Sequence, residues 1–228
     1  MTEQMLDRGR SLPRAKDTSQ RNHNLHVASR KRALAKILKA GEVVFGRRGF
    51  DGATTAEIAK EAGVSKATVH YYFKTKSDLH KGVLDRILNV WADALNEVRA
   101  DREPADALAR YIARKMEYAR KYPELTRLWA IEVLSGAKRI QPFLRGTSRQ
   151  ILSKKGKVIR HWIATGKMDP IDPTHLFFMI WAATQTYAET EAQMISITGK
   201  DALDKVFMRK ATNTISHVIL KGLGLIKV

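Results

Sequence analysis

The chain has 228 residues, of which 41 are Lys or Arg and 23 are Asp or Glu, so its formal net charge is +18 and its pI is near 10.2. This excess of positive charge favours a polyanionic partner, and the absence of cysteine excludes disulfides and thiolate metal sites. The longest apolar run, 176–183, is far shorter than the ~20 residues of a membrane-spanning helix and no signal-peptide pattern opens the chain, so we expect a soluble, cytoplasmic protein with no membrane partner.

Residues 1–29 are polar and Arg-rich and lack helical periodicity, which predicts a flexible arm. The arm either contacts a DNA minor groove or phosphates, or is a solvated tail that only adds charge. Four arginines are the candidates for such contacts: Arg8, Arg10, Arg14 and Arg21. Residues 30–46 follow with an apolar stripe at helical spacing, and Gly46 and Gly49 mark the end of that predicted helix.

The next segment reads as two short helices joined by a tight turn. Thr54 or Thr55 can cap the first, which Gly63 ends, and Ser65 caps the second, residues 66–72. The second helix begins only two residues after the glycine, so the pair must cross closely. The segment predicts a helix-turn-helix, with duplex DNA as the first-choice partner; an ordinary helical hairpin is the alternative.

This stretch resembles the DNA-binding head of the TetR family of bacterial repressors, down to the Tyr71-Tyr72-Phe73 run followed by Lys76 and Leu79. The resemblance implies a three-helix head over residues 30–76 and phosphate contacts from Tyr72 and Lys76. Chemistry alone suggests base-edge or groove contacts from the polar face of the second helix, and phosphate donation from Thr54 or Thr55. The candidates on that face are Lys66, Ala67, Thr68, His70 and Tyr71.

After the head, every segment reads as helix, and residues 77–228 are predicted to form a ligand-binding and dimerisation body. One of its helices, 145–165, is predicted to be basic on its exposed side through Arg149, Lys154, Lys155, Lys157 and Arg160. With three helices in the head, the prediction is an all-α fold of about nine helices. The predicted body helices are 77–100 with Ser77 as its cap, 104–121, 123–136, 145–165, 173–198 and 201–222.

The last two of these helices are unusually apolar, and a monomer would have difficulty burying both stripes. A two-fold homodimer that joins them as a four-helix bundle would cover them, as TetR-like proteins do. Two heads roughly one DNA turn apart would then read a near-palindromic operator. The predicted stripes are Ile180, Ala183, Tyr187 and Met194 on one helix, and Phe207, Ala211, Thr214, Ile215 and Val218 on the other.

Within the body, the string over 169–188, together with Tyr122-Pro123-Glu124 and residues 129–136, resembles the pyrimidine-utilisation regulators of the TetR family. The resemblance implies that uracil or thymine binds inside the body and releases DNA from a repressor. It also implies ligand contacts from three residues: Trp91, Trp181 and Gln185.

Helical spacing places Phe178, Trp181 and Gln185 on one face, opposite the predicted dimer stripe. A glutamine amide can pair with adjacent donors and acceptors on the edge of a uracil ring, and indole faces of Trp91 and Trp181 can sandwich that ring. Glu132 is a weaker candidate, because a carboxylate in an apolar stretch must be paired if it is buried.

Three other functions compete with this interpretation. A TetR-type regulator could sense a larger hydrophobic or cationic effector, and the charge alone would suit an architectural DNA-packaging protein. An enzyme or metal site is suggested by a sequence cluster, but its two Asp residues each precede a proline, where Asp is an ordinary cap. No phosphate loop or nucleophile elbow is present, so we expect no enzyme, metal or cofactor. The cluster is His161, Asp169, Asp172 and His175.

Overall fold

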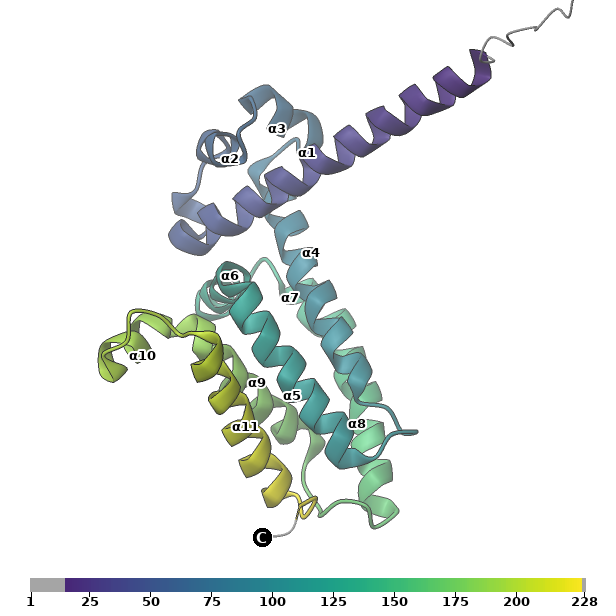
Figure 1. The fold of residues 1–228 in the computed structure, drawn as a ribbon, viewed down its shortest axis with the longest axis vertical. Helices are drawn as coiled ribbons and strands as arrows, with labels where there is room; N and C mark the ends of the chain where they lie inside the picture. Colours follow the sequence, from purple (N-terminus) through teal and green to yellow (C-terminus); the bar gives the residue numbers. More distant parts are fainter. Residues whose placement is uncertain (1–14, 227–228) are drawn as a thin grey trace, which may run out of the picture.

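The computed structural model describes residues 15–226, and the side chains of residues 24–226 apart from residue 26. Over that range the secondary structure is entirely helical with no strand, so the all-α prediction is confirmed. Figure 1 shows a head at one end of the long axis and a helical body at the other, joined by α4. No helix of the described chain is long and apolar enough to cross a membrane.

The head contains α1 (Ala15–Gly52), α2 (Thr55–Ala62) and α3 (Lys66–Tyr72). Thr54 is the residue that caps α2, since its hydroxyl accepts from the Glu57 amide at 3.2 Å. Gly63 ends α2 in the left-handed region at φ 64°, where a residue without Cβ is favoured. Ser65 caps α3 by accepting from the Thr68 amide at 3.0 Å. The predicted helix-turn-helix is confirmed at each of these positions.

Residues 15–29 of the predicted arm are helical, although the sequence there lacks helical periodicity, because α1 begins at Ala15 and continues into the head. Extending an existing helix adds one hydrogen bond per residue fixed, so a polar segment can be helical without an apolar stripe. In Figure 1 this part of α1 projects beyond the rest of the head. Arg8, Arg10 and Arg14 lie outside the described residues, as does the side chain of Arg21.

The C-terminal end of α1 bends at Gly49, whose backbone has φ 66° and ψ −177°. Only glycine adopts such a conformation without strain, so the sequence correctly places a break there. Phe45 and Ile37, one and three turns earlier on α1, are fully buried against α4 and hold the head on the body.

All the helices predicted for the body are present. The predicted helix 173–198 is divided at Thr190, and α4 is capped by Thr75 rather than Ser77, since the Thr75 hydroxyl accepts from Asp78. The elements are α4 (Lys76–Ala94) with η1 (Leu95–Glu97), α5 (Pro104–Lys121), α6 (Pro123–Leu134), α7 (Gln141–Phe143), η2 (Leu144–Ser148), α8 (Arg149–Ala164), α9 (Pro173–Glu189), α10 (Glu191–Thr198) and α11 (Lys205–Gly222).

The predicted dimer stripes are partly wrong. Ile180 is fully buried and Ala211 nearly so, both inside the core of the single chain, and Tyr187 packs on Phe207 with ring centroids 6.4 Å apart. A helix that is apolar on all sides has no periodicity to show which face meets its neighbours. Val218 of the predicted stripe is exposed, and the other large apolar side chains exposed on α9 and α11 are Phe178, Met179 and Val206.

Candidate functional site

The outer face of α3 carries the residues predicted to meet DNA bases. Lys66, Ala67 and His70 are exposed, and Tyr71 is 67% exposed, an unusual position for a large aromatic side chain. Val69 on the opposite side is fully buried in the head core. The face therefore combines donors with one exposed ring, a set that suits the major groove.

The hydroxyls of the three threonines in this region differ in the contacts that they already make within the head. The hydroxyls of Thr54 and Thr68 take part in helix caps, with Thr68 2.9 Å from the Ser65 hydroxyl. The Thr55 hydroxyl lies 3.5 Å from His70 Nε2, which brings the start of α2 to the middle of α3. Thr55 and His70, both predicted to contact DNA, thus lie side by side.

The two residues expected to contact phosphate by resemblance are engaged within the head. The Tyr72 hydroxyl donates to the Arg30 carbonyl at 3.1 Å. The Lys76 ammonium donates to the carbonyls of Phe50 at 2.9 Å and Ala53 at 3.0 Å, and it lies 4.5 Å from the Phe50 ring centroid. In this structure Lys76 caps the end of α1, and its role as a phosphate contact stays a prediction.

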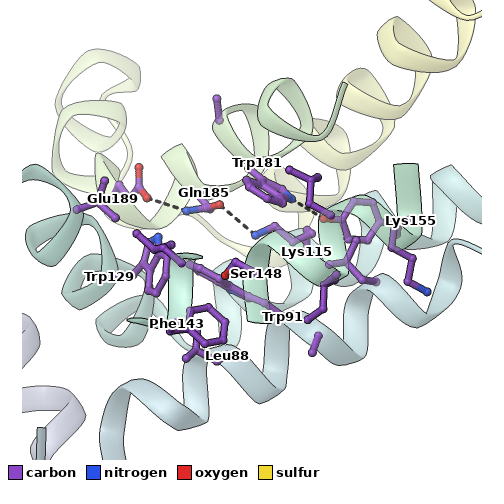
Figure 2. Close-up of a pocket in the computed structure, with 18 residues that line it drawn as sticks. Leu88, Trp91, Lys115, Trp129, Phe143, Ser148, Lys155, Trp181, Gln185 and Glu189 are labelled. Carbon is purple, nitrogen blue, oxygen red and sulfur yellow. Dashed lines mark hydrogen bonds between the residues drawn. The ribbon is translucent and has the colours of Figure 1, made fainter. Parts of the chain in front are cut away.

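The body encloses a cavity of about 340 Å³ between α4, α5, α6, α8 and α9 (Figure 2). The predicted ligand residues Trp91, Trp181 and Gln185 all line it. Its wall is otherwise mostly apolar, with a few polar groups directed inward. That combination is the usual composition of a small-molecule site.

A chain of polar side chains crosses this cavity, and sequence reasoning missed two of its three members. The Lys115 ammonium donates to Gln185 Oε1 at 3.2 Å, and Gln185 Nε2 donates to Glu189 Oε1 at 3.2 Å. Figure 2 shows these side chains in one line from α5 to the end of α9. The cavity therefore presents a cation, an amide and a carboxylate in sequence.

Lys115 is the group in the cavity whose charge is most strongly affected by its surroundings. It is 4% exposed, and burial lowers its pKa to about 7, with Glu189 acting in the opposite direction. Its ammonium lies 4.4 Å from the centroid of the Trp91 ring, a cation–π contact. A hydrogen-bond acceptor placed here would favour the charged form of Lys115.

The aromatic walls differ from the predicted two-indole sandwich. The indole next to Trp91 is that of Trp129, edge to face with centroids 4.8 Å apart. Trp181 is fixed by its indole N–H, which donates to the Tyr111 hydroxyl at 2.6 Å. Tyr111 is itself buried, which raises its pKa, so it remains a neutral partner.

Phe178 does not belong to the cavity. Its side chain is 49% exposed and contacts Trp181 from outside, with ring centroids 5.4 Å apart. The three-residue spacing from Trp181 correctly predicts their contact, but only Trp181 and Gln185 turn inward. The prediction of Phe178 as a ligand contact is therefore corrected.

Glu132 is buried as the sequence analysis anticipates, but at the junction between head and body. It is 2% exposed, burial raises its pKa, and it pairs with Arg139 at 3.4 Å. His80 Nε2 lies 3.4 Å from Glu132 Oε1, and burial, followed by the charges of Arg139 and Lys76, lowers the pKa of His80 to about 4. His80 packs edge-on against Phe45, so this polar pair joins α4 and α6 beneath the end of α1.

The residues that suggested a metal or acid–base site do not gather into one. Asp172 caps α9 by accepting from the amides of Thr174 at 2.7 Å and His175 at 3.1 Å. No group of three His, Asp or Glu residues within the described part of the chain is arranged to hold a metal ion.

Comparisons with known proteins cover nearly the whole described chain. Residues 37–83 match the family described as "Bacterial regulatory proteins, tetR family", and residues 84–226 match the "YcdC-like protein, C-terminal region". The chain is 38% identical over 197 residues to the HTH-type transcriptional regulator RutR of Escherichia coli K12, which spans 86% of this chain and 92% of RutR. It is 29% identical over 196 residues to the HTH-type transcriptional repressor NicS of Pseudomonas putida, which spans 84% of this chain and 92% of NicS.

Solved structures resemble the fold at lower identity. SCO4942 from Streptomyces coelicolor, described as a transcriptional regulator, superposes with a TM-score of 0.64 at 23% identity, over 84% of this chain and 98% of that one. A transcriptional regulator from Rhodococcus sp. Rha1 superposes with a TM-score of 0.59 at 19% identity, over 85% and 99%.

Proposed function

The chain belongs to the TetR family of bacterial regulatory proteins, and we propose that within this family it is a repressor that releases its operator when uracil or thymine binds in the body. The family consists of DNA-binding transcription regulators, so the prediction that the chain is not an enzyme is confirmed. With DNA as its partner, the protein acts in the cytoplasm.

Exposed side chains on α3 and the apolar faces of α9 and α11 support a dimeric reader of DNA. A helix of seven residues is only ~10 Å long at ~1.5 Å per residue and touches few base pairs. Two copies joined through Phe178, Met179, Val206 and Val218 would present two such helices to a near-palindromic operator. Of these residues, Val218 belongs to the stripes predicted from periodicity, and the other three do not.

The observation that carries the choice of ligand is the Lys115–Gln185–Glu189 chain in the cavity. Along one edge, uracil alternates carbonyl acceptors with N–H donors. The Lys115 ammonium suits a carbonyl, Gln185 suits an adjacent donor and acceptor, and the Glu189 carboxylate suits a second N–H. Cytosine presents an amino group where uracil has a carbonyl, so Lys115 would face a donor and reject it.

A larger hydrophobic or cationic effector fits this cavity less well. A volume of about 340 Å³ is near the lower end of the ~300–1,000 Å³ of ligand pockets, which suits a single small ring. A cation would also meet the buried Lys115 ammonium. The resemblance to the pyrimidine-utilisation regulators supports the same choice.

Two helices lead from the cavity to the head. Trp91 is on α4, which begins beside the recognition helix, and Trp129 is on α6, which packs against α1. A ligand that moves either indole would shift the position of the head on the body. The distance between the α3 helices of the two protomers would then change. The ligand must bind this altered state more tightly, since otherwise it could not displace DNA.

Calorimetric titration with uracil, thymine and cytosine tests the proposal. We expect saturable binding of uracil or thymine at one site per chain and no binding of cytosine. Gln185→Ala should lose this binding while it still binds an operator selected from a random-sequence duplex library. The matched control is Gln193→Ala on the exposed side of α10. Absence of heat with all three bases would overturn the ligand assignment, and the DNA-binding assignment would stand separately.

A further inference from the structure

One region of the chain carries positive charge that neither the operator nor the ligand cavity uses. Residues 133–168 contain nine Lys or Arg residues and no Asp or Glu. They form α7, η2 and α8 together with the flanking turns. Arg139 pairs with Glu132 and Asp51, and Lys167 pairs with Glu103. The charge on η2 and α8 has no such acids beside it, so it favours a partner outside the fold.

The α8 helix separates this charge from the ligand cavity. Ser148, Ile151 and Lys155 face the cavity, where the Lys155 ammonium donates to the Val98 carbonyl at 3.0 Å. Lys155, expected on the exposed basic side, is therefore turned inward. The opposite side of the helix is exposed and defines what we call the α8 basic face: Arg145, Arg149, Lys154, Lys157 and Arg160.

No residue of the α8 basic face forms an ion pair with any acid in the described chain. Exposed arginines elsewhere do so, as when Arg110 meets Asp106 at 2.8 Å and Arg120 meets Glu117 at 2.7 Å. Four residues of the α8 basic face, all except Arg160, line a hollow of about 490 Å³ together with Gln150 and Ser153.

We propose that the α8 basic face binds the phosphate backbone of a second DNA duplex, so that one dimer bridges two DNA segments. From residue 145 to 160 the face extends for ~22 Å at ~1.5 Å per residue. Duplex DNA carries one charge per ~1.7 Å of its axis, so a row of phosphates faces the whole length of the face. Gln150 and Ser153 add neutral donors for phosphate oxygens.

The composition of the face favours duplex DNA over other polyanions. Single strands are held by bases stacked on aromatic side chains, and no aromatic residue lines the hollow. Its cations therefore suit a backbone without base reading. A protein held on DNA by its heads also meets neighbouring DNA at a high effective concentration.

The position of α8 indicates that the second segment is separate from the operator. Figure 1 places α2 and α3 at one end of the molecule, while α8 runs along the body toward the other end. A straight duplex lying on α3 does not pass along α8. Both contacts can thus be made at once, by different segments.

A bead assay tests this bridging directly. A biotinylated random-sequence 60-bp duplex on beads is loaded with the full-length protein at low salt, and capture of a second, fluorescent duplex is measured. The test variant is Arg149→Gln/Lys154→Gln/Lys157→Gln. The control removes the same charge from three exposed lysines on the other flank of the body: Lys121→Gln/Lys200→Gln/Lys205→Gln.

We expect the wild type and the control to capture the second duplex and the test variant to lose at least tenfold in capture while still binding the first. Each lost phosphate contact should also reduce the salt slope of random-duplex binding by about 0.9. Capture that is absent in the wild type, retained in the test variant, or lost equally in the control would overturn the proposal. Capture of single-stranded RNA or of an acidic polypeptide in preference to the duplex would also overturn it.

Discussion

Trp129 and Glu132 lie one turn apart on α6, yet Trp129 lines the ligand cavity and Glu132 is buried in the junction beneath the head. A helix is stiff over so short a distance, so the two positions move together. The cavity and the junction beneath the head therefore meet at neighbouring side chains of a single helical turn.

The first prediction concerns Gly46 of α1, whose backbone lies against Glu124 of α6. A Cβ at this position would lie 2.8 Å from the Glu124 carbonyl oxygen, so Gly46→Ala must push the two helices apart. We expect a loss of about 1–3 kcal/mol in unfolding free energy by urea denaturation. Affinity for DNA should fall in the ligand-free protein while affinity for uracil stays unchanged. Gly52→Ala, whose Cβ would make only an ordinary 3.4 Å contact, should match the wild type in all three measurements.

The second prediction concerns protons taken up on ligand binding. Burial lowers the pKa of Lys115 to about 7 in the free protein, and a ligand carbonyl that accepts from its ammonium raises that pKa. Binding should therefore take up protons between pH 7 and 8, and affinity should fall as the pH rises above 7. Calorimetry in buffers of different ionisation enthalpy measures the uptake, which Lys115→Met should abolish. Zero uptake by the wild type would contradict a direct contact between Lys115 and the ligand.

The third prediction concerns stability toward acid. Burial lowers the pKa of His80 from 6.5 to about 4, so the unfolded chain binds more protons than the folded one between these values. The folded state should lose stability as the pH falls from 6.5 toward 4. Scanning calorimetry should show that the Tm of His80→Phe declines less steeply with falling pH than that of the wild type. A phenyl ring at this position can pack against the neighbouring Phe45 and Phe50. His161→Phe, at an exposed position on α8, should keep the wild-type slope.

The fourth prediction separates two roles for Lys76. Because its ammonium satisfies the carbonyls of Phe50 and Ala53, Lys76→Met should cost about 1.5–3 kcal/mol in unfolding free energy. Lys66→Met, at an exposed position on α3, should leave stability unchanged and weaken DNA binding. If Lys76→Met instead reduced the salt slope of DNA binding at unchanged stability, the side chain would be a phosphate contact after all.

Local signals in the sequence predicted the head almost completely. Gly63 and Ser65 determine where α2 ends and α3 begins, whatever surrounds them, because left-handed glycine and a side-chain cap act within a few residues. The same holds for Asp172 before α9. Caps and breaks are properties of a short segment, so a single sequence suffices to find them.

Faces of the body helices were harder to predict, because they depend on what packs against them. On α9, Ile180 and Phe178 exchanged their expected positions: Ile180 is in the core and Phe178 on the surface. Lys115 was missed because lysine usually lies outside, although it occupies the buried register of α5, four residues from both Tyr111 and Ala119. A charged residue in a core register is the signal that would have identified it.

Lys76 also has a consequence for how proteins of this kind diversify. Its ammonium links the end of α1 to the start of α4, so the head is a rigid unit. The orientation of the head is therefore set by α4 and the body. Under the proposed function, substitutions at exposed positions such as Lys66 and His70 would change which DNA sequence is bound without altering the response to ligand. Substitutions in the cavity would change which ligand is bound without altering the DNA sequence. The DNA sequence preference and the ligand specificity would thus change through separate sets of substitutions.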